Sequence, residues 1–267
     1  WVADLRDSVV AHPHRHAERL VVRAKEQGEH AVARLVARNA DAITCVSDAI
    51  ADELRERAPN GEVLTISNGS DFDDFAGMEH HASDRFRLTH AGSFFGKRDP
   101  RPFLTALKQS GLDDVVVRFL GDFRTSDREW AETLDLGDRL ELIPYAPRRR
   151  SLELQRDSEA LLLLIPEAGG RGKGVLSGKV FEYLAAERPI LALVPPDGAA
   201  AELIEAAGAG TVVAPHDVDG IAAALAELHA QWRDGKLDYT RLSPEWRDRV
   251  SRRARIRDFA QLLEKLT

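Results

Sequence analysis

This 267-residue chain has little cysteine, few aromatic residues and no long apolar run. Its single cysteine, Cys45, excludes an internal disulfide framework and a cysteine-rich metal site. A reducing, intracellular setting fits this cysteine usage best. No apolar run approaches the ~20 residues of a membrane span, and no secretory leader is evident. Because the chain begins at Trp1 and contains one methionine, Met78, we expect it to begin partway through a longer protein.

Charged residues are abundant but not concentrated in one region. The 37 lysine and arginine residues and the 44 aspartate and glutamate residues give a net charge of −7. A nucleic-acid-binding protein would usually show a concentrated basic surface, so we expect no nucleic-acid partner. We interpret the run Arg148-Arg149-Arg150 as a solvated turn.

Short apolar segments alternate with longer amphipathic ones, which predicts the parallel sheet of an α/β fold. Strands are expected at 42–47, 62–66, 86–91, 115–120, 140–143, 161–165, 190–194 and 211–214. Helices are expected at 16–39, 48–57, 100–110, 151–158, from 177, 200–207, 218–232 and, as one charged helix with an apolar stripe, 244–266. Residues 1–80 hold too few strands for a complete doubly wound domain, so they predict the last part of such a domain followed by a linker. Residues 81–241 predict one complete parallel α/β domain.

The segment 169–194 joins a glycine-rich loop to the start of a helix and then to a buried strand. Its loop reads Gly169-Gly170-Arg171-Gly172-Lys173-Gly174. Backbone N–H groups at a helix start have no partner within the helix, so this junction favours anion binding. Lys179 and Glu182 share one face of the helix, where Lys179 suits a phosphate and Glu182 a sugar hydroxyl. The alternative is a basic solvated loop before an ordinary surface helix.

Several segments follow one another in a recognisable order. They are Ala40-Asp41-Ala42-Ile43-Thr44-Cys45-Val46-Ser47, Ile66-Ser67-Asn68-Gly69-Ser70-Asp71, His90-Ala91-Gly92-Ser93 through Lys97-Arg98, Gly178-Lys179-Val180-Phe181-Glu182-Tyr183-Leu184-Ala185 and Arg188-Pro189-Ile190-Leu191-Ala192. In this order they resemble the family 4 retaining glycosyltransferases of the GT-B fold, in which two Rossmann-like domains face each other across a cleft. The resemblance implies that residues 81–241 bind the donor and that residues 242–267 form a helix that crosses back to the first domain.

The resemblance implies transfer of a sugar from a UDP- or GDP-sugar to an acceptor hydroxyl, with retention of configuration. The nucleotide sugar is then a substrate, and neither a cofactor nor a metal is expected. Arg98 and Lys179 are expected to stabilise the charge on the departing diphosphate, with Lys97 as a substitute for Arg98. Glu182 is expected to accept hydrogen bonds from the ribose. The other implied donor-binding residues are Gly92, Ser93, Lys97, Gly174, Ser177 and Gly178.

Two positions depart from the family's pattern. An arginine commonly follows the loop glycine where this chain has Ser93, and the first of two motif glutamates is replaced by Gly174. Either backbone groups of the glycine loop replace that glutamate, or a carboxylate such as Glu167 does, or activity is lost; we favour the first. A non-catalytic nucleotide-sugar-binding or scaffold protein is therefore an alternative. A nucleotide-sugar epimerase of the same fold is another, although no acid and base pair is evident for it.

Asp4, Arg6 and Asp7 resemble a stretch on the acceptor side of the cleft in related enzymes. A capped, salt-bridged loop is the alternative for them. The acceptor, whether a sugar, a lipid-linked molecule or another small molecule, is not specified. The expected location is cytoplasmic, including the inner face of the membrane, with peripheral contact made by upstream residues. Because most of the acceptor domain is expected upstream, we expect this chain alone to transfer sugar poorly and to expose apolar surface.

Two patterns mimic metal sites. His12, His14 and His16 alternate in an extended segment, but no carboxylate or cysteine pattern completes a site, so a solvated loop is favoured. Asp71-Phe72-Asp73 mimics the metal-binding motif of a different glycosyltransferase fold, and it lies in the linker.

Overall fold

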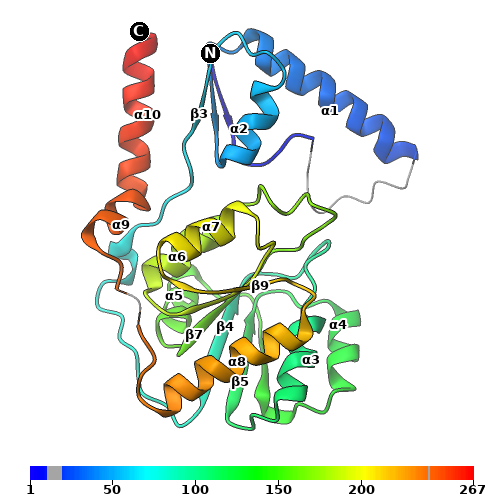
Figure 1. Cartoon of the computed structure of the whole chain (residues 1–267), viewed down its shortest axis with the longest axis vertical. Helices are drawn as coiled ribbons and strands as arrows, with labels where there is room; N and C mark the ends of the chain where they lie inside the picture. The colour runs from blue at the N-terminus through cyan, green and yellow to red at the C-terminus, as the bar shows by residue number, and fades with distance from the viewer. Residues whose placement is uncertain (11–19, 240) are drawn as a thin grey trace.

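A computed structural model describes residues 1–10, 20–239 and 241–267 of the chain. It contains two parallel sheets, one in each of two units stacked along the long axis of the molecule (Figure 1). The expected α/β fold, with one complete and one partial unit, is therefore confirmed. His12, His14 and His16 and the expected start of the first helix at residue 16 lie outside the described residues.

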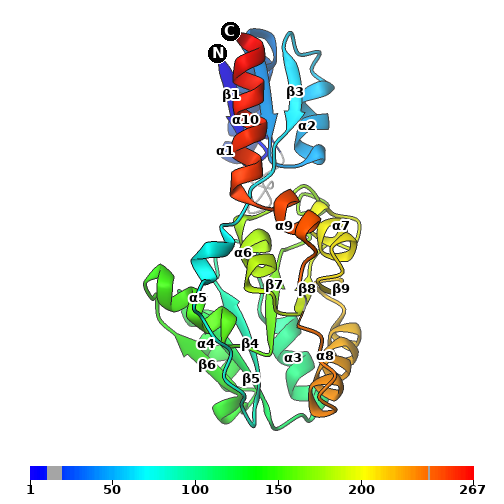
Figure 2. The same cartoon turned by 90° about the vertical axis from the view of Figure 1, so that its left-hand side faces the viewer.

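The first unit is a three-stranded parallel sheet in the order β1-β2-β3. Its elements are β1 (Val2–Leu5), α1 (Leu20–Asn39), β2 (Ala42–Cys45), α2 (Asp48–Arg55) and β3 (Glu62–Thr65). The middle strand β2 is fully buried, as its apolar sequence predicts. Both helices lie on one side of this sheet, and the C-terminal helix lies on the other (Figures 1 and 2).

The second unit is a six-stranded parallel sheet in the order β6-β5-β4-β7-β8-β9. Its strands are β4 (Phe86–Ala91), β5 (Val115–Leu120), β6 (Leu140–Ile143), β7 (Ala160–Leu164), β8 (Ile190–Leu193) and β9 (Gly210–Val213). Its helices are α3 (Arg101–Ser110), α4 (Thr125–Glu132), α5 (Arg148–Arg156), α6 (Gly178–Ala186), α7 (Ala199–Ala206) and α8 (Val218–Arg233). Leucines of β7 alternate between two buried clusters, with Leu161 and Leu163 facing α6 and Leu162 facing α3 and α8. Such burial on both faces is typical of a central parallel strand.

Two crossings of the chain join the units, and they are hydrogen-bonded to each other. Ser70 N–H donates to the Val250 carbonyl at 3.1 Å, and Arg252 N–H donates to the Ser70 carbonyl at 3.0 Å. The prediction of one helix over 244–266 was wrong, because the second crossing divides it into α9 (Pro244–Arg249) and α10 (Arg252–Leu266). The Ser251 hydroxyl, which caps α10 by accepting from Ala254 N–H at 3.0 Å, is a sequence signal for this break.

Close approach of the two crossings requires a glycine at position 69. A Cβ atom there would lie 2.7 Å from Arg252 N and 2.8 Å from Arg252 Cα. Gly69→Ala is therefore expected to lower the free energy of unfolding by about 1–3 kcal/mol, measured by denaturant titration. Gly28→Ala is the matched control, because nothing lies within 4 Å of a Cβ at that exposed position of α1. It is expected to stabilise the chain by about 0.5–1 kcal/mol, and effects of the same sign would contradict the tight crossing.

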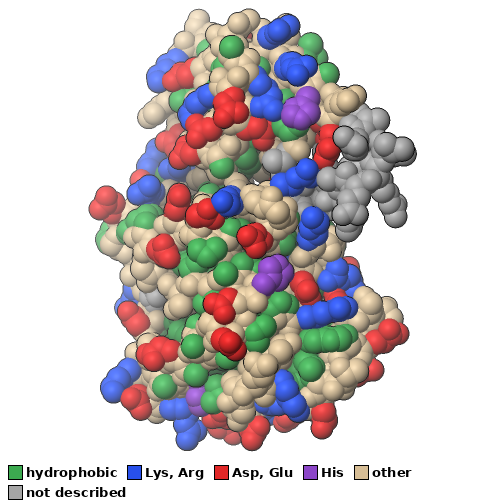
Figure 3. Space-filling view, turned by 45° about the vertical axis from the view of Figure 1, so that its right-hand side comes forward, with side chains coloured by type: hydrophobic (Ala, Val, Ile, Leu, Met, Phe, Trp, Pro, Cys, Tyr) green, Lys and Arg blue, Asp and Glu red, His purple; other side chains and the backbone are tan. Residues whose placement is uncertain are grey.

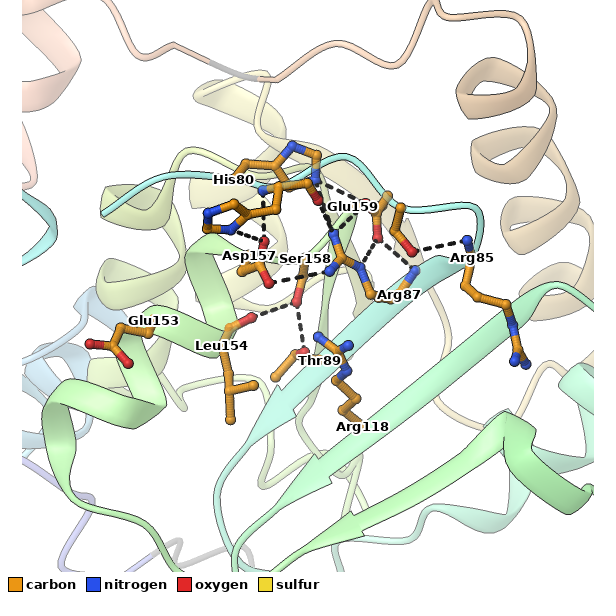
Figure 4. Close-up of polar contacts among 12 residues, drawn as sticks. His80, Arg85, Arg87, Thr89, Arg118, Glu153, Leu154, Asp157, Ser158 and Glu159 are labelled. Carbon is orange, nitrogen blue, oxygen red and sulfur yellow. Dashed lines mark hydrogen bonds and ion pairs between the residues drawn. The ribbon is translucent and has the colours of Figure 1, made fainter. Parts of the chain in front are cut away.

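A buried polar cluster fastens the linker to the amino edge of the second sheet (Figure 4). Glu159, which is fully buried just before β7, accepts hydrogen bonds from the backbone N, Nε and Nη2 of Arg87 at 2.8 Å each. It also pairs with linker residue His80 at 2.9 Å. Tyr239, on the segment returning towards α9, has its ring 5.3 Å from that of His80 and 4.3 Å from the Arg188 guanidinium. Both connecting segments are thus anchored at one point.

Apolar surface is exposed on the first unit and on the last helix, as the sequence predicted. The exposed large side chains of α1 and α10 are Val32, Leu35, Ile256, Leu263 and Leu266. Val250, directly after α9, and Leu262 of α10 are buried, so this C-terminal segment is only partly covered.

Candidate functional site

The strand order of the second sheet reverses between β4 and β7, which makes their carboxyl ends the expected ligand site of an open α/β sheet. Among the described residues, β4 pairs with β7 only through Leu88 with Ala160 and Thr89 with Leu161. By contrast, β4 pairs with β5 along its whole length, from Phe86 to Ala91. The two central strands therefore part before their carboxyl ends.

Where β4 and β7 separate, two buried side chains form hydrogen bonds with backbone groups of these strands. His90 Nδ1 lies 2.8 Å from the Leu162 carbonyl, and the Tyr183 hydroxyl accepts from Ala91 N–H at 2.8 Å. The Leu162 carbonyl can only accept, so His90 carries its proton on Nδ1. Burial, with Lys179 and Arg98 nearby, holds the pKa of His90 well below its ordinary value, so the ring is neutral.

Arg98 brings a positive charge to the carboxyl ends of β4 and β7. Its Nη1 donates to the Ser93 carbonyl at 2.7 Å, and its Nε donates to the Leu164 carbonyl at the end of β7 at 3.3 Å. Its guanidinium also lies 5.0 Å from the ring centroid of Phe95. Burial lowers the pKa of Arg98, but an arginine remains charged at neutral pH.

Lys179, in the first turn of α6, places its side-chain amino group near the Arg98 guanidinium. It lies directly over Gly92, where a Cβ atom would overlap Lys179 Nζ. Gly92 also has a φ of +136°, which favours glycine. Burial, and then the charge of Arg98, lowers the pKa of Lys179 to about 7. Of the carboxylates in the described residues, none lies within ion-pair distance of Arg98 or Lys179.

The start of α6 is open towards a cavity between the two units. The Ser177 hydroxyl makes no capping hydrogen bond, and Ser177 and Gly178 line a cavity of 410 Å³ together with Arg6 and Asp7 of the first unit. Uncapped N–H groups at a helix start attract anions. The structure therefore brings predicted donor-side and acceptor-side residues to one cavity.

Glu182 is held by two side chains that sequence reasoning missed. Its Oε1 accepts from Gln155 Nε2 at 2.6 Å, and its Oε2 accepts from Arg148 Nη1 at 3.0 Å. Arg148 Nη2 also donates to Asp74 of the linker. The interpretation of Arg148 as part of a solvated turn was wrong, because α5 begins at this residue. Each carboxylate oxygen of Glu182 keeps acceptor capacity for a further hydrogen bond.

The positions that depart from the family's pattern have structural roles. The Ser93 hydroxyl accepts from Asp122 N–H at 3.1 Å and so joins the loops after β4 and β5. The Gly174 carbonyl accepts from the Ser47 hydroxyl at 2.8 Å, and a Cβ at Gly174 would lie 3.4 Å from Ala49 Cβ. Gly174 therefore packs on the start of α2.

Some predicted residues lie apart from the cavity beside α6. Lys97 and Glu167 line a separate cavity of 470 Å³, so the structure does not bring Glu167 to Gly174. Asp4 accepts from Arg6 Nε at 2.8 Å and from the Thr44 hydroxyl at 2.7 Å, as in the salt-bridged alternative. Asp4, Arg6 and Glu182 nevertheless line one cavity of 630 Å³.

Three further features concern metal ligands, membrane spans and surface charge in the described part of the chain. In residues 1–10, 20–239 and 241–267, no group of three or more His, Cys, Asp and Glu side chains is placed to hold a metal ion. Asp71 instead pairs with Arg252 at 2.9 Å. None of the helices in the described part of the chain is long and apolar enough to span a membrane. On the face drawn in Figure 3, acidic and basic side chains are interspersed over both units.

Comparison with known proteins gave matches by structure. No protein-family model matches this chain, and no curated protein matches it by sequence. A glycosyltransferase from Rickettsia africae ESF-5 has a TM-score of 0.71 at 14% identity, over 88% of this chain and 66% of that protein. HepE from Anabaena, in complex with UDP-glucose, has a TM-score of 0.72 at 16% identity, over 99% of this chain and 72% of that protein. WaaG, a glycosyltransferase involved in lipopolysaccharide biosynthesis, has a TM-score of 0.62 at 17% identity, over 94% of this chain and 75% of that protein.

The chain thus spans between 66% and 75% of the length of these proteins. At such low identity the likeness concerns the fold. The likeness to HepE extends over 99% of this chain, and so includes both of its parallel-sheet units. This chain has the GT-B fold, with its second unit complete and its first unit partial.

Proposed function

We propose that this chain binds a nucleoside diphosphate sugar at the carboxyl ends of β4 and β7 and acts in a retaining glycosyltransferase of the family 4 type. One observation carries the proposal. Arg98 and Lys179 meet at the switch point beside the uncapped start of α6, with no carboxylate of the described residues in ion-pair contact with either. Two cations and free amide groups suit a diphosphate. Glu182, on the next part of α6, suits the adjacent ribose hydroxyls.

The proposed chemistry depends on stabilising the leaving group. As the bond between the sugar and the diphosphate breaks, negative charge grows on the diphosphate, where Arg98, Lys179 and the α6 amides stabilise it. The acceptor approaches the face from which the diphosphate leaves, and the diphosphate takes the proton of the acceptor hydroxyl. No protein nucleophile is then required. The cavity lined by Arg6 and Asp7 is proposed to receive the acceptor.

The donor is proposed to be a UDP- or GDP-sugar, and the UDP-glucose bound to HepE favours uridine. The acceptor is proposed to be a sugar, a lipid-linked molecule or another small molecule in cell-envelope or polysaccharide synthesis. The involvement of WaaG in lipopolysaccharide biosynthesis supports such a role. We place the reaction in the cytoplasm or at the inner face of the membrane, without a cofactor or nucleic acid.

Replacing Arg98 with alanine tests the phosphate role. The variant is expected to bind UDP about 10- to 30-fold more weakly, because a charge-assisted hydrogen bond is lost, and to bind uridine unchanged. Glu182→Gln is expected to weaken the binding of both UDP and uridine, since both ligands carry the ribose. Calorimetric titration with UDP, GDP and ADP and their nucleosides measures these affinities. Arg128→Ala, on the exposed side of α4, is the matched control. Equal weakening of UDP and uridine by Arg98→Ala would contradict the assignment.

A product assay separates the proposed function from its alternatives. Incubation with a nucleotide sugar and acceptors yields free nucleoside diphosphate from a transferase and an isomeric donor from an epimerase. A non-catalytic binding protein yields neither, and the Gly174 contact with α2, where the family has a glutamate, favours that second candidate. Failure of a folded sample to bind any of the three diphosphates would exclude the site itself.

A further inference from the structure

The loop between β4 and α3 carries Arg98, and its outer half is solvent-exposed. Gly96 and Lys97 are exposed, and Phe95 is 52% exposed. Phe94 N–H donates to the Asp122 carbonyl of the loop after β5 at 2.8 Å, and within the loop Arg98 N–H donates to the Phe95 carbonyl at 3.2 Å. Neither of these two contacts engages the carbonyl groups of Gly96 and Arg98.

Arg124, the residue before α4, supplies that support from outside the loop. Its Nη1 donates to the Gly96 carbonyl at 2.9 Å, and its Nη2 donates to the Arg98 carbonyl at 2.8 Å. The planar guanidinium matches two acceptors at once, which a lysine ammonium does with less geometric control. The backbone on both sides of Lys97 is therefore held by one side chain.

A buried carboxylate in turn holds Arg124. Asp127, which is 1% exposed, accepts from Arg124 Nε through Oδ2 and from Arg101 Nε and Nη2 through Oδ1 at 3.3 and 3.2 Å. A buried carboxylate is strongly disfavoured without cationic partners, so this arrangement resists change. The contacts run from α3 through α4 to the loop, and they end at the backbone of Arg98.

We propose that Arg124 is a positioning residue that fixes the loop carrying Arg98 and thereby presents the Arg98 guanidinium to the phosphates of a bound nucleoside diphosphate. The proposal rests on the function proposed above for Arg98. Arg124 itself acts through backbone carbonyls and has no contact with the ligand in this role. Arg101→Ala is its matched control, because it removes a guanidinium from the same Asp127 and leaves both carbonyl contacts in place.

Hydrogen exchange of the full chain without ligand tests the positioning directly. In Arg124→Ala, the amides of Phe94 and Arg98 are expected to exchange about tenfold faster, and in Arg101→Ala at the rate of the unmodified chain. Arg124→Lys keeps a cation beside Asp127, so it provides a folded variant if the alanine variant is unstable, and its exchange is expected to rise as well. Equal exchange in all four proteins would overturn the proposal.

Titration with UDP and uridine tests the effect on the site. Arg124→Ala is expected to weaken the binding of UDP about tenfold and the binding of uridine by less than about twofold. In an Arg98→Ala background it is expected to have no further effect on UDP, because the two residues act as one unit. A persistent loss in that background would overturn the proposal. If the unmodified chain binds no diphosphate, the proposed function fails, and hydrogen exchange still decides whether Arg124 positions the loop.

Discussion

Replacing Arg87 with alanine is expected to lower the free energy of unfolding by about 3–5 kcal/mol, because it leaves a fully buried carboxylate without its cation. Glu159 accepts three hydrogen bonds from Arg87, and Asp157 pairs with the same guanidinium at 3.2 Å. Figure 4 shows these acidic groups converging on Arg87 from the segment before β7. Denaturant titration at pH 7 measures the loss, and hydrogen exchange of residues 76–85 reports release of the linker.

Arg85→Ala provides the matched control two residues earlier. Its partner, Asp138, has a side chain that is 81% exposed, so water and salt screen this pair and its loss is expected to change the free energy of unfolding little. Burial raises the pKa of Glu159, but hydrogen bonds from Arg87 and His80 more than offset that effect, and the net pKa lies below its ordinary value of 4.5. The contribution of the Glu159 carboxylate to the free energy of unfolding is therefore complete above pH 4.5 and is lost as the pH falls further. Equal destabilisation by the two alanine variants would contradict a structural role for the buried cluster.

Diphosphate affinity is expected to fall about 50-fold between pH 7 and pH 9 because of Lys179. Its pKa of about 7 in the free protein means that the amino group is largely neutral above pH 7. A bound diphosphate favours the protonated form, so binding above pH 7 takes up a proton, and affinity falls as the pH rises. Calorimetric titration of UDP in buffers with different ionisation enthalpies measures the proton uptake, which is expected to approach one at pH 8.5.

Other groups near Lys179 do not titrate in this range. The pKa of His90 lies well below its ordinary value and that of Tyr183 above its ordinary value, in both cases chiefly because of burial. Lys179→Arg is the matched variant, because its charge persists at every pH tested. Its UDP affinity is expected to be independent of pH between 7 and 9. If the fall of UDP affinity with rising pH were unchanged in Lys179→Arg, another group would be the one that takes up the proton.

Local sequence patterns predicted the elements of the second sheet closely. β4, β5 and β6 have the predicted bounds 86–91, 115–120 and 140–143, and each is a short segment with several apolar residues, bordered by polar or turn-forming residues. The glycine loop, the helix after Ser177 and the shared face of Lys179 and Glu182 also follow from sequence neighbours. The nearness of Arg98 to Lys179 came from the family resemblance rather than from any pattern in the residues.

Contacts between distant segments were outside the reach of such patterns. Gln155 and Arg148 meet Glu182, and Arg124 meets the Arg98 loop, only because strand order brings their helices and loops together. The break between α9 and α10 arises where Ser251 pairs with Ser70, 181 positions earlier in the chain. Likewise, the Ser47 contact makes Gly174 part of the interface between the units. Hydrophobic period and helix caps act over a few residues, and they determined the elements of this protein. Its site was decided by packing across the sheet and between the units, where burial and charge pairing act on residues that lie far apart in sequence.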